Sequence, residues 1–346
     1  SGGGSAAAGG AAAVKGTVAG ALKIKIAAMV AAGVVAVGGT AAMLHQPAVT
    51  FSDPAFEHNI RILLDQPEGD IHEKDLEQIR SLYVVEDGKT TSWGQGLYLE
   101  AEEGTTAVES LEDISLLTKL DRLDYLVPDD GALLETVGEQ KSLYSFTNAW
   151  DEPQVYLRDL SFLDRFPNLG ILSLKVAPGT DLTPVETKSS LTSLLLVADG
   201  DNLLDVSQLT NLQSLSIATP LSGGTKVESS VQLPQLRSLS LSGGLEGPPV
   251  LGFVEQTPGL EFLSVTYLPD TDLTPLAGLA NLRAVTLYDN VPYDLTPLTA
   301  CTKLEICCLS EENTAVVPSG LPVIKENPAN WDLAYEIQAE VEGWER

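Results

Sequence analysis

The sequence predicts an α/β fold built as a solenoid, with short parallel strands on its concave face, 3-10 or short helices on its convex face, and helical caps at both ends. One observation behind this prediction is the tetrapeptide DLTP, which occurs at residues 181–184, 272–275 and 294–297. The last two copies start 22 residues apart, and the first two start 91 apart, close to four such periods. A second observation is an apolar ladder with the same stride. Self-similarity at a fixed period of about 20–50 residues is typical of solenoids.

Each repeat contains a series of apolar residues, here called the ladder, whose spacing along the sequence changes from three residues to two. In residues 272–290 its members are Leu273, Leu276, Leu279, Leu282, Val285 and Leu287. A spacing of three suits a tight 3-10 turn with one buried face, and a spacing of two suits a strand. The same frame starts at Leu160, Leu182, Leu203 and Leu295, and looser copies start near Leu111, Leu134, Val227 and Leu251. Nine units of turn and strand are therefore expected, with a further strand at 82–84.

This ladder resembles the leucine-rich-repeat family in its short bacterial form of about 22 residues. The resemblance covers residues 111–310 and is most regular over 159–310. It implies a leucine-rich-repeat solenoid that binds other molecules on its concave face. The Asn that the family usually places three residues after the last Leu of the strand is present at Asn290. The matching positions elsewhere hold Ala177, Asp199, Pro220, Gly244 and Leu268.

The motif DLTP is interpreted as the start of the convex turn of a repeat. Thr is expected to cap the helical turn and Pro to take its first position, where no N–H is needed. The two leucines that flank Thr-Pro are expected to face the core. This interpretation assigns the motif no catalytic role.

A helical cap is expected on each end of the stack, because stacked repeats leave an apolar face at both ends. Residues 51–84 are predicted to form the N-terminal cap, with a helix starting at Asp53-Pro54. Their pattern resembles the helical segment that precedes the repeats in bacterial surface proteins of this family. Residues 85–110 are predicted to be an irregular insertion. Residues 311–346 are predicted to form the C-terminal cap, including an amphipathic helix around Trp331, Leu333, Tyr335 and Ile337.

Residues 26–44 form an uncharged run preceded by Lys15, Lys23 and Lys25. As a helix, this run would span about 28 Å at about 1.5 Å per residue, close to the thickness of a bilayer core. It predicts a transmembrane helix over 23–45 after a Gly/Ala-rich linker at 1–22. The lysines place the N-terminus in the cytoplasm, so the protein is expected in the cell membrane as a single-pass protein with its repeat domain extracellular. A cleaved signal peptide and a buried soluble helix are the alternatives.

The charge and the sparse reactive residues argue against several functions. All 48 acidic residues follow position 52, against 17 basic residues after position 45, and such a surface repels phosphate backbones. Nucleic acid is therefore not expected as a partner. His45, His58 and His72 form no recognisable catalytic motif. Cys301, Cys307 and Cys308 suit buried apolar positions, with a disulfide as the alternative. No enzyme activity, cofactor or metal is predicted.

The strand residues that alternate with the core positions are expected to line the concave face and bind a ligand. The candidate positions are Leu195, Val197, Ser214, Ser216, Ser238, Ser240, Phe262, Ser264, Thr286 and Tyr288. Phe262 and Tyr288 are the strongest candidates, because aromatic residues are enriched at interfaces. A protein or peptide is the expected ligand. The alternative is that Ser and Thr only pack well there and the site lies elsewhere. Two functions remain open: a sensory ectodomain of a signalling protein, and a structural or adhesive surface protein without a signalling role.

Overall fold

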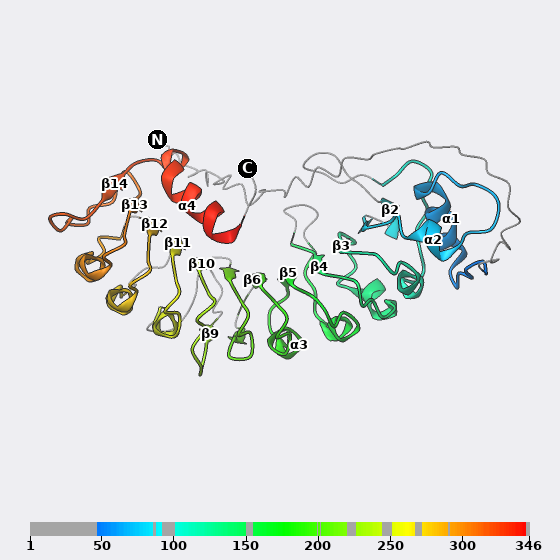
Figure 1. Cartoon of the computed structure of the whole chain (residues 1–346), viewed down its shortest axis with the longest axis horizontal. Helices are drawn as coiled ribbons and strands as arrows, with labels where there is room; N and C mark the ends of the chain where they lie inside the picture. Colours follow the sequence, from blue (N-terminus) through cyan, green and yellow to red (C-terminus); the bar gives the residue numbers. More distant parts are fainter. Residues whose placement is uncertain are drawn as a thin grey trace, which may run out of the picture.

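A computed structural model of the chain describes residues 47–85, 88–91, 101–149, 155–198, 200, 202–219, 226–243, 251–266, 272–289 and 291–343. They contain one curved sheet of twelve strands and a separate two-stranded pair (Figure 1). The order in the large sheet is β14-β13-β12-β11-β10-β8-β6-β5-β4-β3-β1-β2. Its strands are β1 (Ser81–Val84), β2 (Thr90–Thr91), β3 (Arg122–Tyr125), β4 (Ser145–Thr147), β5 (Ile171–Val176), β6 (Ser193–Ala198), β8 (Ser214–Ala218), β10 (Ser238–Ser242), β11 (Phe262–Thr266), β12 (Ala284–Tyr288), β13 (Ile306–Leu309) and β14 (Val323–Lys325).

All neighbouring strands of this sheet run parallel except β2, which pairs antiparallel with β1. The register matches equivalent positions of successive repeats, so that Leu239 of β10 lies opposite Leu215 of β8 and Leu263 of β11. The predicted solenoid is therefore confirmed, with one strand contributed by each repeat.

The outer side of the arc carries one short element per repeat (Figure 1). Seven repeats use a helical turn: η2 (Glu112–Leu116), η3 (Ala132–Thr136), η4 (Ser161–Arg165), α3 (Thr183–Glu186), η5 (Gly252–Gln256), η6 (Thr274–Gly278) and η7 (Thr296–Ala300). In the two repeats between α3 and η5, the short strands β7 (Leu203–Asp205) and β9 (Lys226–Glu228) pair with each other instead. The Thr-Pro pair of DLTP does not decide this difference, because η2, η3, η4 and η5 form helical turns without it.

The ladder residues point inward and form one continuous apolar core that runs from Phe56 to Ala315. Each fully buried Leu, Val or Phe contributes about 1.5–3 kcal/mol relative to an exposed side chain. Three rings, Phe146, Phe162 and Phe166, pack together with centroids 5.1 to 5.9 Å apart. The core therefore depends on nearest-neighbour repeats, as stacked repeats require.

The prediction that Thr caps the turn in DLTP was wrong. In all three copies the Leu occupies the capping position, Thr is the first helical residue and Pro the second. The Asp is the side chain that closes the turn, because its Oδ1 accepts a hydrogen bond from the Thr backbone N–H at 2.9 to 3.0 Å. The hydrogen bond from the hydroxyl of the same Thr, followed by this backbone bond, lowers the pKa of Asp181, Asp272 and Asp294 below the usual value. Asp is thus conserved among the three copies for a local backbone contact, an Asx-type turn.

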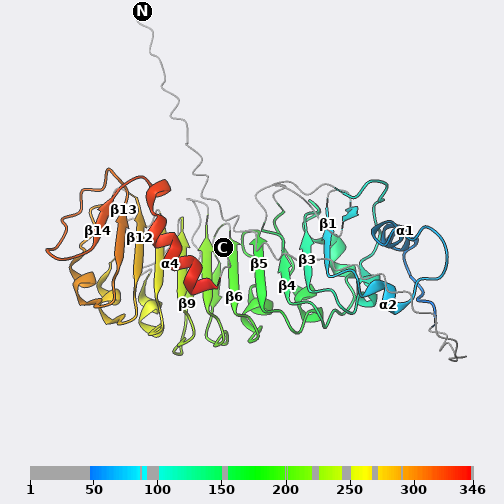
Figure 2. The same ribbon diagram turned by 45° about the horizontal axis from the view of Figure 1, so that its top comes forward.

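Two helices, α1 (Pro54–Leu63) and α2 (Glu73–Leu76), lie at the N-terminal end of the sheet, near β2 in Figure 1 and near β1 in Figure 2. Asp53 caps α1 by accepting bonds from the N–H groups of Ala55 and Phe56, and its second oxygen accepts from Glu109 and Ser110. Asp113 of the first repeat in turn accepts bonds from the backbone N–H groups of Ser52 and Asp53. These two carboxylates therefore join the helices to the stack.

The C-terminal end of the chain turns back from β14 through η8 (Pro328–Asn330) into α4 (Asp332–Glu342). Helix α4 lies on the inner side of the arc in Figure 1 and crosses in front of the strands in Figure 2. The C-terminal helix therefore covers part of the concave face as well as following the last strand.

The structure does not support the predicted localisation as a single-pass membrane protein, and this prediction was wrong. No helix within the described residues is long and apolar enough to cross a membrane. The longest of them, α4, has 11 residues and spans about 16 Å, whereas a bilayer core is about 30 Å thick. The predicted linker at 1–22, the transmembrane helix at 23–45 and Asn290 lie outside the described residues, as do residues 86–87 and 92–100 of the predicted insertion.

Candidate functional site

All ten predicted binding residues lie on the concave side of the strands, in rows that the parallel register defines. One row runs through Ser214, Ser238 and Phe262, and continues to Ala284 and Ile306. A second row runs through Leu195, Ser216, Ser240, Ser264 and Thr286, and continues to Cys308 and Ile324. A third row contains both Val197 and Tyr288. The structure brings these residues onto one continuous surface.

Helix α4 crosses this surface over β10, β11, β12 and β13. Its buried side chains are Trp331, just before the helix, and Ala334, Ile337 and Val341. They pack against the outward residues of three strands: Phe262, Ala284, Ile306 and Cys308. The spacing of three and four along the helix places its apolar residues on one stripe that faces the sheet.

Four of the predicted binding residues consequently contact α4 or lie beneath it. Phe262 is 1% exposed, and Ser238 and Thr286 are also buried. Tyr288 packs edge-on against Trp331, with ring centroids 6.0 Å apart. A ligand can therefore reach Ser238, Phe262 and Thr286 only if α4 moves, whereas Tyr288 stays partly exposed.

Sequence reasoning missed this contact, although one signal was present in the strands. The outward positions change from Ser193, Ser214 and Ser238 to Phe262, Ala284 and Ile306 along one row, so the face becomes apolar in the repeats that α4 covers. In the helix, the two further residues named by the sequence, Leu333 and Tyr335, face away and are 43% and 45% exposed. The stripe that packs is instead formed with two small or branched residues, Ala334 and Val341.

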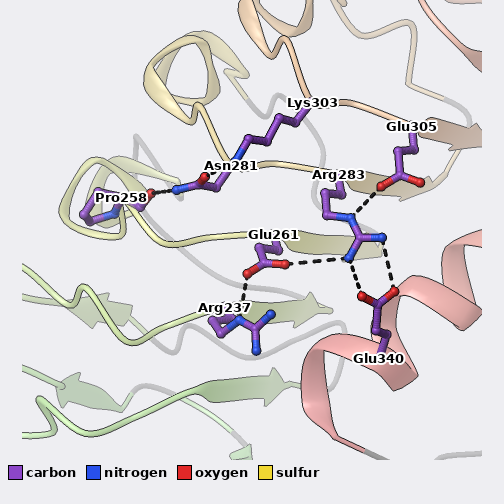
Figure 3. Close-up of polar contacts among 8 residues, drawn as sticks. All are labelled: Arg237, Pro258, Glu261, Asn281, Arg283, Lys303, Glu305 and Glu340. Carbon is purple, nitrogen blue, oxygen red and sulfur yellow. Dashed lines mark hydrogen bonds and ion pairs between the residues drawn. The ribbon is translucent and has the colours of Figure 1, made fainter.

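A row of charged residues at the beginning of the strands binds the C-terminal end of α4 (Figure 3). Arg237, Glu261, Arg283 and Glu305 each precede the first residue of a strand in four successive repeats. Arg237 Nε lies 2.7 Å from Glu261 Oε1, and Arg283 Nε lies 2.5 Å from Glu305 Oε1. Arg283 also donates both Nη groups to Glu340 of α4, at 3.1 and 3.2 Å.

The shared bonds change the acidity of both partners. The hydrogen bond to Glu340, followed by that to Glu305, raises the pKa of Arg283 above its usual value. The bond from Arg283 lowers the pKa of Glu340. At the same end of the helix, Ser238 Oγ donates to Glu342 Oε1 at 2.5 Å. The acidic end of α4 is therefore matched to a cationic and a hydroxyl group of the sheet.

The part of the concave face formed by β4, β5, β6 and β8 has no helix packed over it among the described residues. Ile171, Leu195 and Val197 are only partly buried there, and Ser214 and Ser216 border them. We call these five residues the open surface. Further along, on β3, Arg122 binds both oxygens of buried Asp124 at 2.7 Å and lies over the ring of Tyr83. These charged groups satisfy one another, whereas the open surface offers partly exposed aliphatic side chains with hydroxyl groups beside them.

The three cysteines are buried and are not placed as reactive groups among the described residues. Cys301, Cys307 and Cys308 are free and buried, and burial raises the pKa of Cys307 and of Cys308 to about 12. Such thiols are protonated at neutral pH and are poor nucleophiles. Within the described residues, no group of three His, Cys, Asp or Glu side chains is placed to hold a metal ion.

Comparison with known proteins identifies similar folds but no relative in sequence. No family model and no curated protein matches the chain. Among solved structures, internalin C2 of Listeria monocytogenes is 20% identical, covers 77% of this chain and 99% of its own, and has a TM-score of 0.41. An internalin F of the same organism is 21% identical, with coverages of 74% and 95% and a TM-score of 0.30. A leucine-rich-repeat protein of Leptospira interrogans is 17% identical, with coverages of 65% and 54% and a TM-score of 0.41. Likenesses at this level say nothing about what this chain binds.

Proposed function

We propose that this protein binds a protein or peptide on the open surface. The observation that supports the proposal is the group Ile171, Leu195 and Val197, three aliphatic side chains that stay partly exposed at the centre of a sheet face. Apolar centres surrounded by polar groups are typical of protein interfaces. The surrounding serine hydroxyls can donate and accept hydrogen bonds, so they suit an extended or irregular peptide backbone.

The charge of the chain favours a basic partner. The full sequence has 48 acidic and 20 basic residues and a formal net charge of −28. A field of this sign accelerates the approach of cationic molecules and disfavours anionic ones. The expected ligand therefore combines apolar side chains for the centre with Lys or Arg at its edges. Binding of this kind is a step that a sensory role and an adhesive role share.

Replacing both Leu195 and Val197 by Ser is expected to weaken peptide binding at least about tenfold, because central apolar contacts contribute about 1 kcal/mol or more each. The measurement is selection of binders from a random peptide library on the immobilised chain, followed by titration of the selected peptides. Selected sequences are expected to be enriched in aromatic or aliphatic residues and in Lys and Arg.

The matched control is Val316→Ser, because Val316 is 85% exposed and lies in the segment between β13 and β14. This variant should bind the selected peptides like the parent chain. Equal affinity of the parent and the Leu195/Val197 variant for every selected peptide would exclude the open surface as the site.

A further inference from the structure

The residues beneath α4 form a second surface that is separated from the core by the sheet itself. We call Phe262, Ala284, Ile306 and Cys308 the covered surface. Together with α4, they make an apolar cluster that shares no buried member with the main core. The two clusters lie on opposite sides of β11, β12 and β13, since successive strand residues point to opposite faces. Moving α4 away therefore leaves the ladder of leucines inside the solenoid packed.

The contact of α4 with the sheet contains features that favour release. Trp331 is buried, yet its Nε1 has no hydrogen-bond partner among the described residues. A buried donor without a partner is destabilising, and it regains a bond to water when the helix leaves. The ion pair of Glu340 with Arg283 lies at the exposed end, where Glu340 is largely in solvent and salt screens the attraction. Release is thus opposed by four apolar side chains and by the solvent-accessible bonds of Glu340 and Glu342.

The covered surface specifies the kind of helix that fits it. Position by position, α4 supplies an aromatic ring at 331, a small residue at 334, branched residues at 337 and 341, and carboxylates at 340 and 342. On the sheet, the ring of Tyr288 packs against Trp331, and Ala284 and Cys308 belong to the same apolar cluster as the helix residues. Arg283 donates to Glu340 and Ser238 donates to Glu342. A helix without the acidic end leaves Arg283 with fewer partners, and one with large residues at its centre collides with the sheet.

We propose that the covered surface is a binding site for an amphipathic helix with an acidic C-terminal end, and that α4 is its intramolecular occupant. A partner helix with this pattern takes the place of α4 when α4 is released. The released state joins the covered surface to the open surface along the same rows of strand residues. This site is separate from the one of the preceding section, because neither Leu195 nor Val197 contacts α4.

Cys308 provides a natural reporter, since it is the one thiol on the covered surface and Cys307 points into the main core. The experiment treats the full chain with a thiol reagent and follows each cysteine by peptide mapping. In the parent protein Cys308 is expected to react before Cys307 without global unfolding. In Trp331→Ala its rate is expected to rise on the order of 100-fold, as losing a buried aromatic ring shifts an equilibrium by at least that much. Leu333→Ala, on the exposed side of α4, should leave the rate unchanged.

The binding step is tested with a synthetic peptide of residues 327–343. Excess peptide is expected to slow labelling of Cys308 in the Trp331→Ala chain, and the same peptide carrying Ile337→Asp is not. Ile337→Ala replaces Trp331→Ala if circular dichroism shows that the latter does not fold. Labelling of Cys308 only together with Cys307, or a lack of protection by the peptide, would overturn the proposal. Replacing Leu195 and Val197 leaves Cys308 labelling unchanged, so the two binding sites are tested independently.

Discussion

Phe166→Ala is expected to lower the free energy of unfolding by about 3–5 kcal/mol, the largest effect of any single side chain considered. The ring of Phe166 is fully buried and packs against Phe146 and Phe162, with centroids 5.9 Å from each. Alanine leaves a cavity between two repeats, and the strands on either side cannot close it without losing their register. Urea unfolding followed by circular dichroism measures the change.

The control for this substitution is Val316→Ala, at a position that is almost fully exposed. Its free energy of unfolding should stay within about 0.5 kcal/mol of the parent value. A loss below about 1 kcal/mol for Phe166→Ala would mean that neighbouring repeats collapse into the space, contrary to the tight packing of the aromatic cluster.

Asp53→Ala is expected to destabilise the N-terminal end by about 3 kcal/mol. The side chain accepts bonds from four backbone N–H groups: two at the start of α1, and those of Glu109 and Ser110. Loss of a helix cap costs about 0.5–2 kcal/mol, and each buried N–H left without an acceptor costs about 1–3 kcal/mol. Hydrogen exchange of α1 and thermal unfolding measure the effect. Asp272→Ala serves as control, since its oxygen closes one exposed turn, and a loss as large as that of Asp53→Ala would contradict the interpretation.

The contribution of Asp53 also depends on pH. Burial raises the pKa of Asp53, but the backbone bonds from Glu109, Ala55, Ser110 and Phe56 outweigh burial and hold the pKa below its usual value. A carboxylate with a lowered pKa stabilises the fold above its unfolded pKa of about 3.9, and this stabilisation is lost as the pH falls through the folded value. The difference in unfolding free energy between the parent and Asp53→Asn should therefore be constant above about pH 5 and shrink below about pH 4.

The repeat frame could be predicted from the sequence because one spacing pattern determines both the local structure and the packing. Leu273, Leu276 and Val285 repeat because each faces the same neighbour in the next coil, so their period predicts the sheet and its register. The spacing pattern could not show whether Asp or Thr caps the turn in DLTP. Both residue types satisfy backbone N–H groups, and the spacing alone does not say which side chain reaches.

The candidate surface was only partly predictable. The alternation of strand residues predicts which side chains point to the concave face, but it does not predict which other segment packs on them. Leu195 and Val197 stay accessible, whereas Phe262 is enclosed by α4. Distinguishing the two requires knowing where a helix about 70 residues later in the chain returns, which is a long-range contact with no periodic signal. The composition of the helix, with Leu333 and Tyr335 beside Trp331 and Ile337, also favoured the wrong stripe.

The charged residues at the beginning of the strands have a consequence for correct assembly. A stack of near-identical coils is at risk of pairing a strand with the next but one, since the leucine rows match after any whole number of repeats. In the row of charged residues of Figure 3 the sign alternates from Arg237 to Glu261, to Arg283 and to Glu305. Skipping one coil would place Arg237 beside Arg283, or Glu261 beside Glu305, and like charges on adjacent strands repel. The alternation of charge thus disfavours pairing of a strand with the next but one, which the repeated leucines do not prevent.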